Sequence, residues 1–379
     1  MNISPGLRQK MNVDFFTYSY VPISIKKLWL DSVSYVIQSG NFIGGSYVTK
    51  FEKEFADLCK SNYAVGVSNG FDGLEIALRA LGIGHGDTVV VPAHTFIATW
   101  NAVLAVGASP LGVDVGNDAQ IDVLQFQEIA LRRKISCVIP VHMHGHMSDM
   151  VELAKICRNL NIPIIEDASQ SHFAERDGKI AGTTGDISVF SLYPTKNLGA
   201  LGDAGVIITN QMNLATKARK LANYGSENND KYHHNEIGYN KRLDAVQAAI
   251  LRVNLDFINE WNSIRKNLAR IYVDCCEELK ISYLKGREGS VWHHFCIKAS
   301  NRDAVQAFLL GQGIGTDIHY PFLAADEVEQ FAGLKRGKYP IAKELSNSLL
   351  SLPISQFHDQ EMITYVCKIL KKARSQHIL

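Results

Sequence analysis

Residues 162–170 read Ile-Pro-Ile-Ile-Glu-Asp-Ala-Ser-Gln, an apolar run that passes directly into acidic and amide side chains. The run Ile162–Ile165 predicts a strand buried on both faces. A helical pattern precedes it at Met150–Asn159, and another apolar strand is expected at Ile187–Phe190. Short apolar strands that alternate with helices are typical of an α/β protein whose mainly parallel sheet lies between helical layers.

The alternation of strands and helices extends to about residue 210, and we expect a helix at Asp72–Ala80. Further strands are predicted at Tyr63–Val67, Thr88–Val91, Cys137–Val141 and Gly205–Thr209. A long helical stretch, Asp244–Ile264, indicates the passage into a smaller α+β domain that ends in a helix near Asp359–Lys372. A chain of 379 residues also exceeds the usual size of a single core. We therefore expect a large domain over residues 1–255 and a small domain over residues 256–379.

The overall composition excludes several classes of protein. The net charge is +1, with 46% hydrophobic and 20% charged residues, which is an ordinary globular balance without a general attraction for nucleic acid or anionic membranes. No apolar run is long enough to span a bilayer, and residues 1–6 lack the features of a signal peptide. The seven cysteines are scattered, as expected for reduced thiols. We therefore expect a cytoplasmic protein.

Polar clusters follow four of the predicted strands. They are Ser68-Asn69-Gly70, Ala93-His94-Thr95-Phe96, Glu166-Asp167-Ala168-Ser169-Gln170, and the segment from Ser191 to Lys196. In open α/β sheets, ligands bind beyond the carboxyl ends of the strands. One such cluster would mean little, but four of them predict a binding site at this edge of the sheet.

Two residues of these clusters fit the needs of pyridoxal 5′-phosphate (PLP). PLP requires a lysine amine that forms a Schiff base and an acid that keeps its pyridine nitrogen protonated. Lys196 can supply the amine, which can also act as a general base, and Asp167 can supply the acid. Taken singly, Asp167 is better explained as a strand-end cap and Lys196 as a solvated loop residue. Their positions after neighbouring strands make the PLP interpretation the better one.

Other positions fit the phosphate and the ring of the same cofactor. The turn from Ser68 to Asp72 leads into a helix, and amides at a helix amino terminus bind phosphate well, although an ordinary helix cap is an equal alternative. Ser191 can add a hydroxyl donor. Phe96 can stack on the ring or can be a core aromatic.

The histidines do not predict a metal site. His142, His144 and His146 alternate, but no carboxylate or cysteine is spaced to complete a zinc site. The adjacent pairs His233-His234 and His293-His294 indicate substrate contacts or plain surface. We therefore expect no bound metal.

Several motifs together resemble the DegT-type sugar-nucleotide aminotransferases. These are Gly40-Asn-Phe-Ile-Gly-Gly45, Ser68-Asn-Gly70, Glu166-Asp-Ala-Ser-Gln-Ser-His172, Ser191-Leu-Tyr-Pro-Thr-Lys-Asn-Leu-Gly-Ala-Leu-Gly-Asp-Ala-Gly205, Gly238-Tyr-Asn-Lys-Arg-Leu243 with Gln247, and His319-Tyr-Pro321. They run in the family's order across nearly the whole chain. The resemblance implies a fold-type I, PLP-dependent homodimer with active sites shared between the subunits.

The resemblance also assigns roles to individual residues. Lys196 would hold the cofactor and Asp167 would face its pyridine nitrogen. The remaining cofactor contacts would come from Gly70 and Phe71 through their amides, Ser191, Gln170, the ring of Phe96, and Asn240 of the other subunit. Tyr193, His319 and Tyr320 would contact the substrate.

The segment Pro194–Gly205 is most similar to the family branch that aminates C3 of dTDP-3-keto-6-deoxyhexoses, with L-glutamate as donor and 2-oxoglutarate as product. Such reactions supply deoxyaminosugars for O-antigen, S-layer glycans or antibiotics. Departures from the family pattern at Met143–His146 and Lys241 leave open a 4-keto-sugar enzyme acting on a UDP-, GDP- or dTDP-sugar. Some relatives are PLP-dependent dehydratases with histidine in place of the lysine, which Lys196 argues against. A regulatory or sensor protein on the same scaffold is the alternative of another class.

Overall fold

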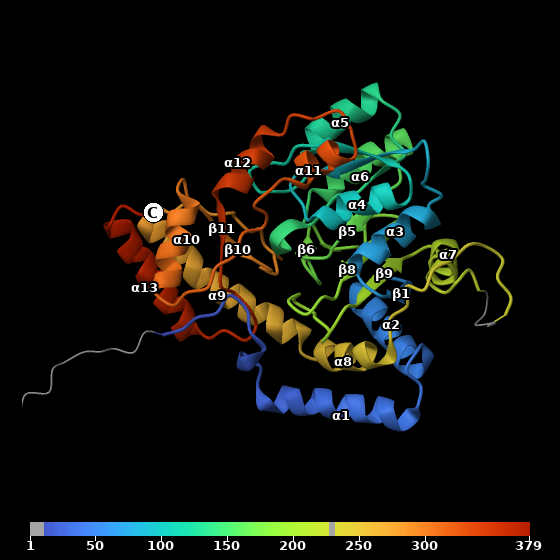
Figure 1. The fold of residues 1–379 in the computed structure, drawn as a ribbon, viewed down its shortest axis with the longest axis horizontal. Helices are drawn as coiled ribbons and strands as arrows, with labels where there is room; N and C mark the ends of the chain where they lie inside the picture. The colour runs from blue at the N-terminus through green and yellow to red at the C-terminus, as the bar shows by residue number, and fades with distance from the viewer. Residues whose placement is uncertain (1–10, 227–231) are drawn as a thin grey trace, which may run out of the picture.

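The computed structural model describes residues 11–226 and 232–379 (Figure 1). Residues 1–6, on which the prediction about a signal peptide depends, lie outside these ranges. Within them, one mixed sheet lies between two layers of helices, and a group of helices with a two-stranded sheet stands beside it. The α/β fold with a smaller C-terminal α+β region was predicted.

The large sheet is built from two hydrogen-bonded groups of strands. The first has the order β1-β9-β8-β5 and the second β3-β2-β4, and the isolated parallel bridges Val138–Ile164 and Val141–Asp167 join them. The strands are β1 (Tyr63–Val67), β2 (Thr88–Pro92), β3 (Ser109–Val113), β4 (Cys137–Val138), β5 (Ile165–Asp167), β8 (Ile187–Ser191) and β9 (Gly205–Thr209). Because only β9 pairs antiparallel with its neighbours, the carboxyl ends of β1, β2, β5 and β8 meet at one edge. The four polar clusters follow these four ends.

Most predicted strands are confirmed within a few residues. Two corrections concern their bounds, because β5 begins at Ile165 rather than Ile162 and β4 ends at Val138 rather than Val141. Proline explains both: Pro163 and Pro140 have no amide hydrogen and so cannot donate to a neighbouring strand. Strand β3 was not predicted, since its sequence Ser-Pro-Leu-Gly-Val contains two residues that are rare in strands.

Alternate residues of the strands face two separate hydrophobic cores. Val189 and Ile207 pack on one side of the sheet, and Phe190 and Ile208 on the other. The first core is covered by α3 (Gly70–Ala80), α4 (Ile97–Ala105), α7 (Met212–Ala222), α11 (Ala324–Phe331) and α12 (Pro340–Ser348). The second is covered by α1 (Ile23–Ser39), α2 (Gly45–Cys59), α5 (Val123–Arg132), α6 (Met150–Leu160) and α8 (Ala245–Leu255). This burial on both faces explains the near-continuous apolar strands.

The single helix predicted over Asp244–Ile264 is wrong in its continuity. The chain forms α8 and then α9 (Ile258–Leu279), with the break at Asp256 and Phe257. The two helices bury different faces, because α8 packs against α1 and α2 under the sheet, whereas most of α9 packs in the C-terminal core. A single straight helix could not pack its apolar side chains into both cores.

The C-terminal part has a core of its own. Strands β10 (Phe295–Lys298) and β11 (Leu349–Leu352) pair antiparallel, and α9, α10 (Arg302–Gly311) and α13 (Gln360–Ser375) pack around them. Helices α11 and α12 belong instead to the core of the large sheet. The division at residue 255 stays a prediction. Three smaller elements, η1 (Tyr18–Tyr20), η2 (Met143–Gly145) and the hairpin β6 (Glu175–Arg176) with β7 (Lys179–Ile180), complete the fold.

Arg265 of α9 ties this helix to the segments beside the large sheet. Its buried guanidinium donates to Gln356 Oε1 at 3.0 Å and to the carbonyls of Trp292, His293 and Ile354 at 3.1–3.2 Å. Among residues 11–226 and 232–379, no carboxylate pairs with it. The hydrogen bonds to these four oxygens therefore provide most of the stabilisation of the buried guanidinium.

Arg265→Ala should lower the free energy of unfolding by about 3 kcal/mol, because three buried carbonyls and an amide oxygen lose their donor. Urea unfolding followed by circular dichroism measures this. Arg270→Ala, on the exposed side of the same helix, is the control and should change stability by less than about 0.5 kcal/mol. Equal effects of the two substitutions would show that Arg265 has no special role.

No helix in the described part of the chain is both long enough and apolar enough to cross a membrane.

Candidate active site

A cavity of about 470 Å³ lies at the edge of the sheet where β1, β2, β5 and β8 end. Each of the four polar clusters contributes to its wall, for example through Gly70, Phe96, Asp167 and Lys196. Residues from the C-terminal part, including His294 and Tyr320, close the other side. The structure thus brings together residues that are up to 250 positions apart in the sequence.

Lys196 lies in the loop after β8, where its backbone amide donates to Tyr193 O at 2.9 Å. Within the described ranges, its Nζ has no hydrogen bond and no ion pair, so the amine is free to react. Burial lowers the pKa of this amine to about 8. The nearby carboxylate of Asp167 acts in the opposite direction, because its negative charge raises the pKa of the amine. A lysine amine with a lowered pKa is a better nucleophile and base near neutral pH.

Asp167 is buried at the end of β5 and is fixed from both sides. Its Oδ2 accepts from Thr99 Oγ1 at 2.9 Å, and its Oδ1 accepts from the amide of Ser169 at 3.1 Å. Its backbone pairs with Pro140 and His142. Asp167 is therefore more than a strand-end cap, since its carboxyl group forms part of the cavity wall.

The amino terminus of α3 forms one end of the cavity. Asn69 caps the helix by accepting from the amide of Asp72 at 2.8 Å, whereas the amides of Gly70 and Phe71 donate to no residue of the described ranges. Ser191 stands directly opposite, because a Cβ at position 70 would lie 2.8 Å from Ser191 Cβ. Two free amides and a hydroxyl at a helix amino terminus suit a phosphate group.

Aromatic side chains form the mouth of the cavity. Phe96 is 54% exposed, so it is not a core aromatic, and its ring lies 5.4 Å from that of Tyr320. The Tyr320 hydroxyl accepts from Gln170 Nε2 at 3.0 Å, while Gln170 Oε1 accepts from the amide of His144 at 2.7 Å. Tyr193 lines the cavity and is 51% exposed. Both ends of the Gln170 amide thus have partners within the protein.

A group of buried histidines supports the wall behind Tyr320. The rings of His294 and His319 stack 3.8 Å apart, and His319 Nδ1 bonds Ser351 Oγ at 2.9 Å. His144 Nδ1 lies 3.2 Å from His294 Nδ1. His293 and His294 therefore belong to the cavity rather than to plain surface, whereas His233 and His234 are exposed.

Two of the alternating histidines have a carboxylate or a thiol as neighbour. His142 Nε2 lies 2.8 Å from Glu166 Oε2, and Cys296 Sγ lies 3.6 Å from His144 Nδ1. Each contact involves only a pair, and no group of three ligands able to hold a metal ion occurs in the described ranges. Glu166 also accepts from the amides of Gly182, Thr184 and Gly185, so it fixes the loop before β8.

These histidines predict acid sensitivity. Burial lowers the pKa of His94, His146 and His319 to about 4 and that of His172 to about 3. In the unfolded chain they titrate near 6.5, so only the unfolded state gains protons as the pH falls below that value. The free energy of unfolding therefore has its full value above pH 6.5. Below pH 6.5, each such histidine lowers it by up to about 1.4 kcal/mol for every pH unit. Urea midpoints at pH 7.5 and 5.5 should differ clearly, and equal midpoints would contradict the neutral, buried state.

Asn240 does not line the cavity of its own chain. It is exposed and forms an antiparallel bridge with Asn223, which lines a second cavity of about 920 Å³. Arg242 faces that cavity and bonds Asn223 Oδ1 at 2.9 Å, but its buried Nε has no partner. No carboxylate of the described residues pairs with Arg242, and its guanidinium carbon lies 5.4 Å from the ring centre of Tyr224.

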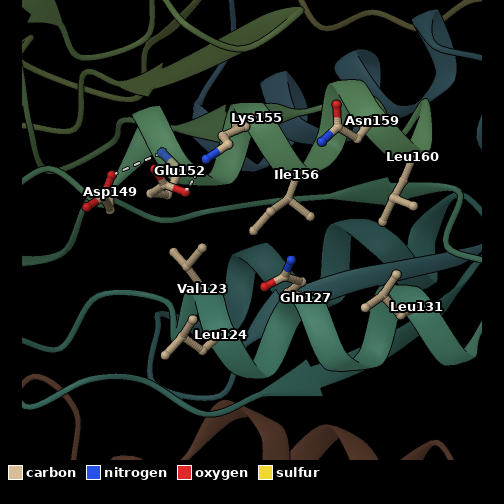
Figure 2. A pocket seen from close by; sticks show the side chains of 10 residues that line it. All are labelled: Val123, Leu124, Gln127, Leu131, Asp149, Glu152, Lys155, Ile156, Asn159 and Leu160. Carbon is tan, nitrogen blue, oxygen red and sulfur yellow. Dashed lines mark hydrogen bonds and ion pairs between the residues drawn. The ribbon is translucent and has the colours of Figure 1, made fainter.

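Sequence reasoning missed Thr99 and Arg242. Thr99 follows Phe96 by three residues and belongs to α4. Its hydrogen bond to Asp167, 68 residues away, is visible only in the structure. Arg242 lay inside a quoted motif, but its lack of a carboxylate partner among the described residues is visible only in three dimensions. A groove lies between α5 and α6, and Figure 2 shows Val123 and Leu131 of α5 pointing toward the helix that carries Ile156. The lysine and one carboxylate of this groove, Lys155 and Glu152, are exposed and pair with each other.

The residues present fit PLP. The cavity offers a free lysine amine, a fixed carboxylate and aromatic rings at its mouth. It also ends in two unpaired amides opposite a hydroxyl group, where a phosphate can be held. The cofactor would thus find a partner for each of its reactive or charged groups.

Comparisons with known proteins agree with this fit. Residues 24–371 match the model of the DegT/DnrJ/EryC1/StrS aminotransferase family. The chain is 38% identical to dTDP-3-amino-3,4,6-trideoxy-alpha-D-glucose transaminase of Streptomyces venezuelae, over 85% of this chain and 86% of that protein. It is also 38% identical to a pleiotropic regulatory protein of Geobacillus stearothermophilus, over 94% and 97% of the two chains.

The fold has close counterparts among solved structures. The crystal structure of S. venezuelae DesV in complex with a ketimine intermediate superposes with a TM-score of 0.90 at 35% identity, over 96% of this chain and 98% of that one. Relatives named for dTDP-, UDP- and GDP-linked sugars occur among the matches. The protein therefore belongs to the DegT/DnrJ/EryC1/StrS aminotransferase family and is a PLP-dependent transaminase of the fold-type I class.

Proposed function

We propose that the protein transfers the amino group of L-glutamate to a nucleotide-linked keto-sugar, at C3 of a dTDP-3-keto-6-deoxyhexose. The observation that carries the proposal is the joint placement of the free amine of Lys196, the fixed carboxylate of Asp167 and the unpaired amides of Gly70 and Phe71 in one cavity. The S. venezuelae relative named as a dTDP-3-amino-sugar transaminase supports the choice of sugar.

PLP, when bound, supplies an electron sink that stabilises negative charge on the carbon next to the nitrogen. Lys196 holds the cofactor at rest and moves a proton at the reacting carbon once its amine is free. A pKa of about 8 suits this role, because the amine then exchanges protons readily near neutral pH. Asp167 holds the proton on the pyridine nitrogen, and Thr99 keeps its carboxylate oriented.

The remaining residues bind and orient the cofactor and the substrate. Gly70, Phe71 and Ser191 hold the phosphate, and Phe96 covers the ring at the mouth of the cavity. Gln170, held by the His144 amide and the Tyr320 hydroxyl, would contact the ring hydroxyl. Tyr193, His319 and Tyr320 face the substrate and exclude water.

A homodimer completes each site in this proposal. The first α-helix and the segment after it expose large apolar side chains, with exposed fractions between 48% and 82%: Ile23, Leu30, Ile37, Phe42 and Ile43. A second copy would cover these apolar groups. Asn240 would then reach the phosphate of the neighbouring subunit, and Arg242 beside it would bind an anionic group of a substrate.

The location and the division of the chain follow from the same proposal. We place the enzyme in the cytoplasm, where its nucleotide-sugar substrate would be made, and its seven free cysteines support this. The large domain, residues 1–255, would bind PLP, and the small domain, residues 256–379, would close the cavity.

A panel of substrates tests the choice of sugar. The holoenzyme is incubated with L-glutamate and with 3-keto and 4-keto sugars linked to dTDP or UDP, and amino-sugar formation is measured by mass spectrometry. The proposal predicts the highest kcat/KM for the dTDP-3-keto-6-deoxyhexose. Preference for a 4-keto sugar or a UDP-sugar would favour the alternative assignment and overturn this one.

A further inference from the structure

Lys241 forms an ion-pair cluster beside the proposed phosphate site. Its Nζ lies 2.8 Å from Asp72 Oδ1 and also pairs with Glu75, and the three side chains are only 8–16% exposed. Asp72 and Glu75 belong to the first two turns of α3, the helix whose free amides face the cavity. The cluster therefore sits next to the place where a phosphate dianion would bind.

The first turn of α3 carries a charge that opposes phosphate binding. Asp72 also accepts from Ser68 Oγ and from Asn69 Nδ2 at 2.8 Å, so its carboxylate is held close to the capping residue. Glu75 is partly balanced by Arg79 at 2.9 Å. Asp72 has no basic partner in the described ranges other than Lys241. Without Lys241, the site would present one uncompensated negative charge to a doubly negative ligand.

The position of Lys241 is also fixed by its backbone. Its carbonyl accepts from the amide of Ser68 at 3.2 Å, and its own amide donates to Ala222 O at 3.0 Å. Its Nζ lies 5.8 Å from the ring centre of Phe71, one of the two residues with a free amide. The segment that carries Lys241 is thus paired with the turn that leads into α3.

We infer that Lys241 is a positioning residue that balances the charge of Asp72 and Glu75, and so permits the amino terminus of α3 to bind the cofactor's phosphate. This inference rests on the proposed function, because it requires the phosphate to lie at Gly70, Phe71 and Ser191. Lys241 acts through the acidic side chains and not by touching the cofactor.

The test compares two ligands of the apoprotein, PLP and pyridoxal, which lacks the phosphate. Dissociation constants are measured by absorbance titration. Lys241→Met should weaken PLP about tenfold and leave pyridoxal unchanged, since the repulsion acts on the phosphate alone. Lys241→Arg should retain the affinity for PLP. Equal weakening of both ligands, or no weakening of PLP, would overturn the inference.

Three further variants keep the test decisive. Asp72→Asn alone should tighten PLP several-fold, and combined with Lys241→Met it should restore affinity, even if the single methionine variant folds poorly. Failure of Asp72→Asn to change PLP affinity would count against the inference. Ser191→Ala separates the two proposals: if it weakens PLP and Lys241→Met does not, only the role of Lys241 fails. If Ser191→Ala also has no effect, the placement of the phosphate is wrong.

Discussion

Lys196→Ala is expected to reduce turnover by about ten-thousandfold, because the same amine holds the cofactor and moves the proton at the reacting carbon. The protein should also lose the visible absorbance of lysine-bound PLP. The fold should be preserved, since Lys196 Nζ makes no hydrogen bond or ion pair with any residue that the structure describes. Single-turnover kinetics and an absorbance spectrum measure the two effects.

Lys179→Ala is the matched control for this prediction. Lys179 is exposed on the hairpin of β6 and β7, outside the cavity. Its removal should change neither the spectrum nor the turnover. A Lys196→Ala variant with normal absorbance and turnover would show that another residue holds the cofactor.

Asp167→Asn should reduce turnover by about a thousandfold while the protein stays folded. Asparagine has nearly the same shape, and its oxygen can still accept from Ser169, while its amide can donate to Thr99 Oγ1. What is lost is the negative charge that keeps the pyridine nitrogen protonated. Stopped-flow measurement of the reaction with glutamate isolates this step.

Thr99→Val separates the charge of Asp167 from its orientation. The variant keeps the carboxylate but removes the hydroxyl donor 2.9 Å away, so we expect a loss of only about tenfold. A loss for Asp167→Asn as small as that for Thr99→Val would mean that the charge of Asp167 is not needed.

The sequence was sufficient to predict the edge of the sheet where the site lies. Apolar strands followed by polar clusters put Gly70, Phe96, Asp167 and Lys196 at one end, and the common direction of β1, β2, β5 and β8 brings them together. The family motifs then indicated a role for each residue. Short-range patterns were enough here because each cluster directly follows its strand.

Features that depend on packing between distant segments could not be predicted in this way. Thr99 and Asp167 are 68 residues apart in the sequence and meet only through the packing of α4 on the sheet, and the stacked rings of His294 and His319 depend on two separate C-terminal segments. The break between α8 and α9 was missed because both halves have helical patterns, and only their different cores show that they separate. Lys241 looked like a departure from a motif until its contacts with Asp72 and Glu75 were visible.

The cavity at Lys196 is proposed to perform transamination with glutamate. The most direct test of this proposal is the absorbance spectrum of the PLP-loaded protein before and after addition of L-glutamate. The band of lysine-bound PLP should disappear, 2-oxoglutarate should form in an equal amount, and added 2-oxoglutarate should restore the band. A band that persists unchanged in glutamate, or a protein that never binds PLP, would contradict the proposal and favour a regulatory protein.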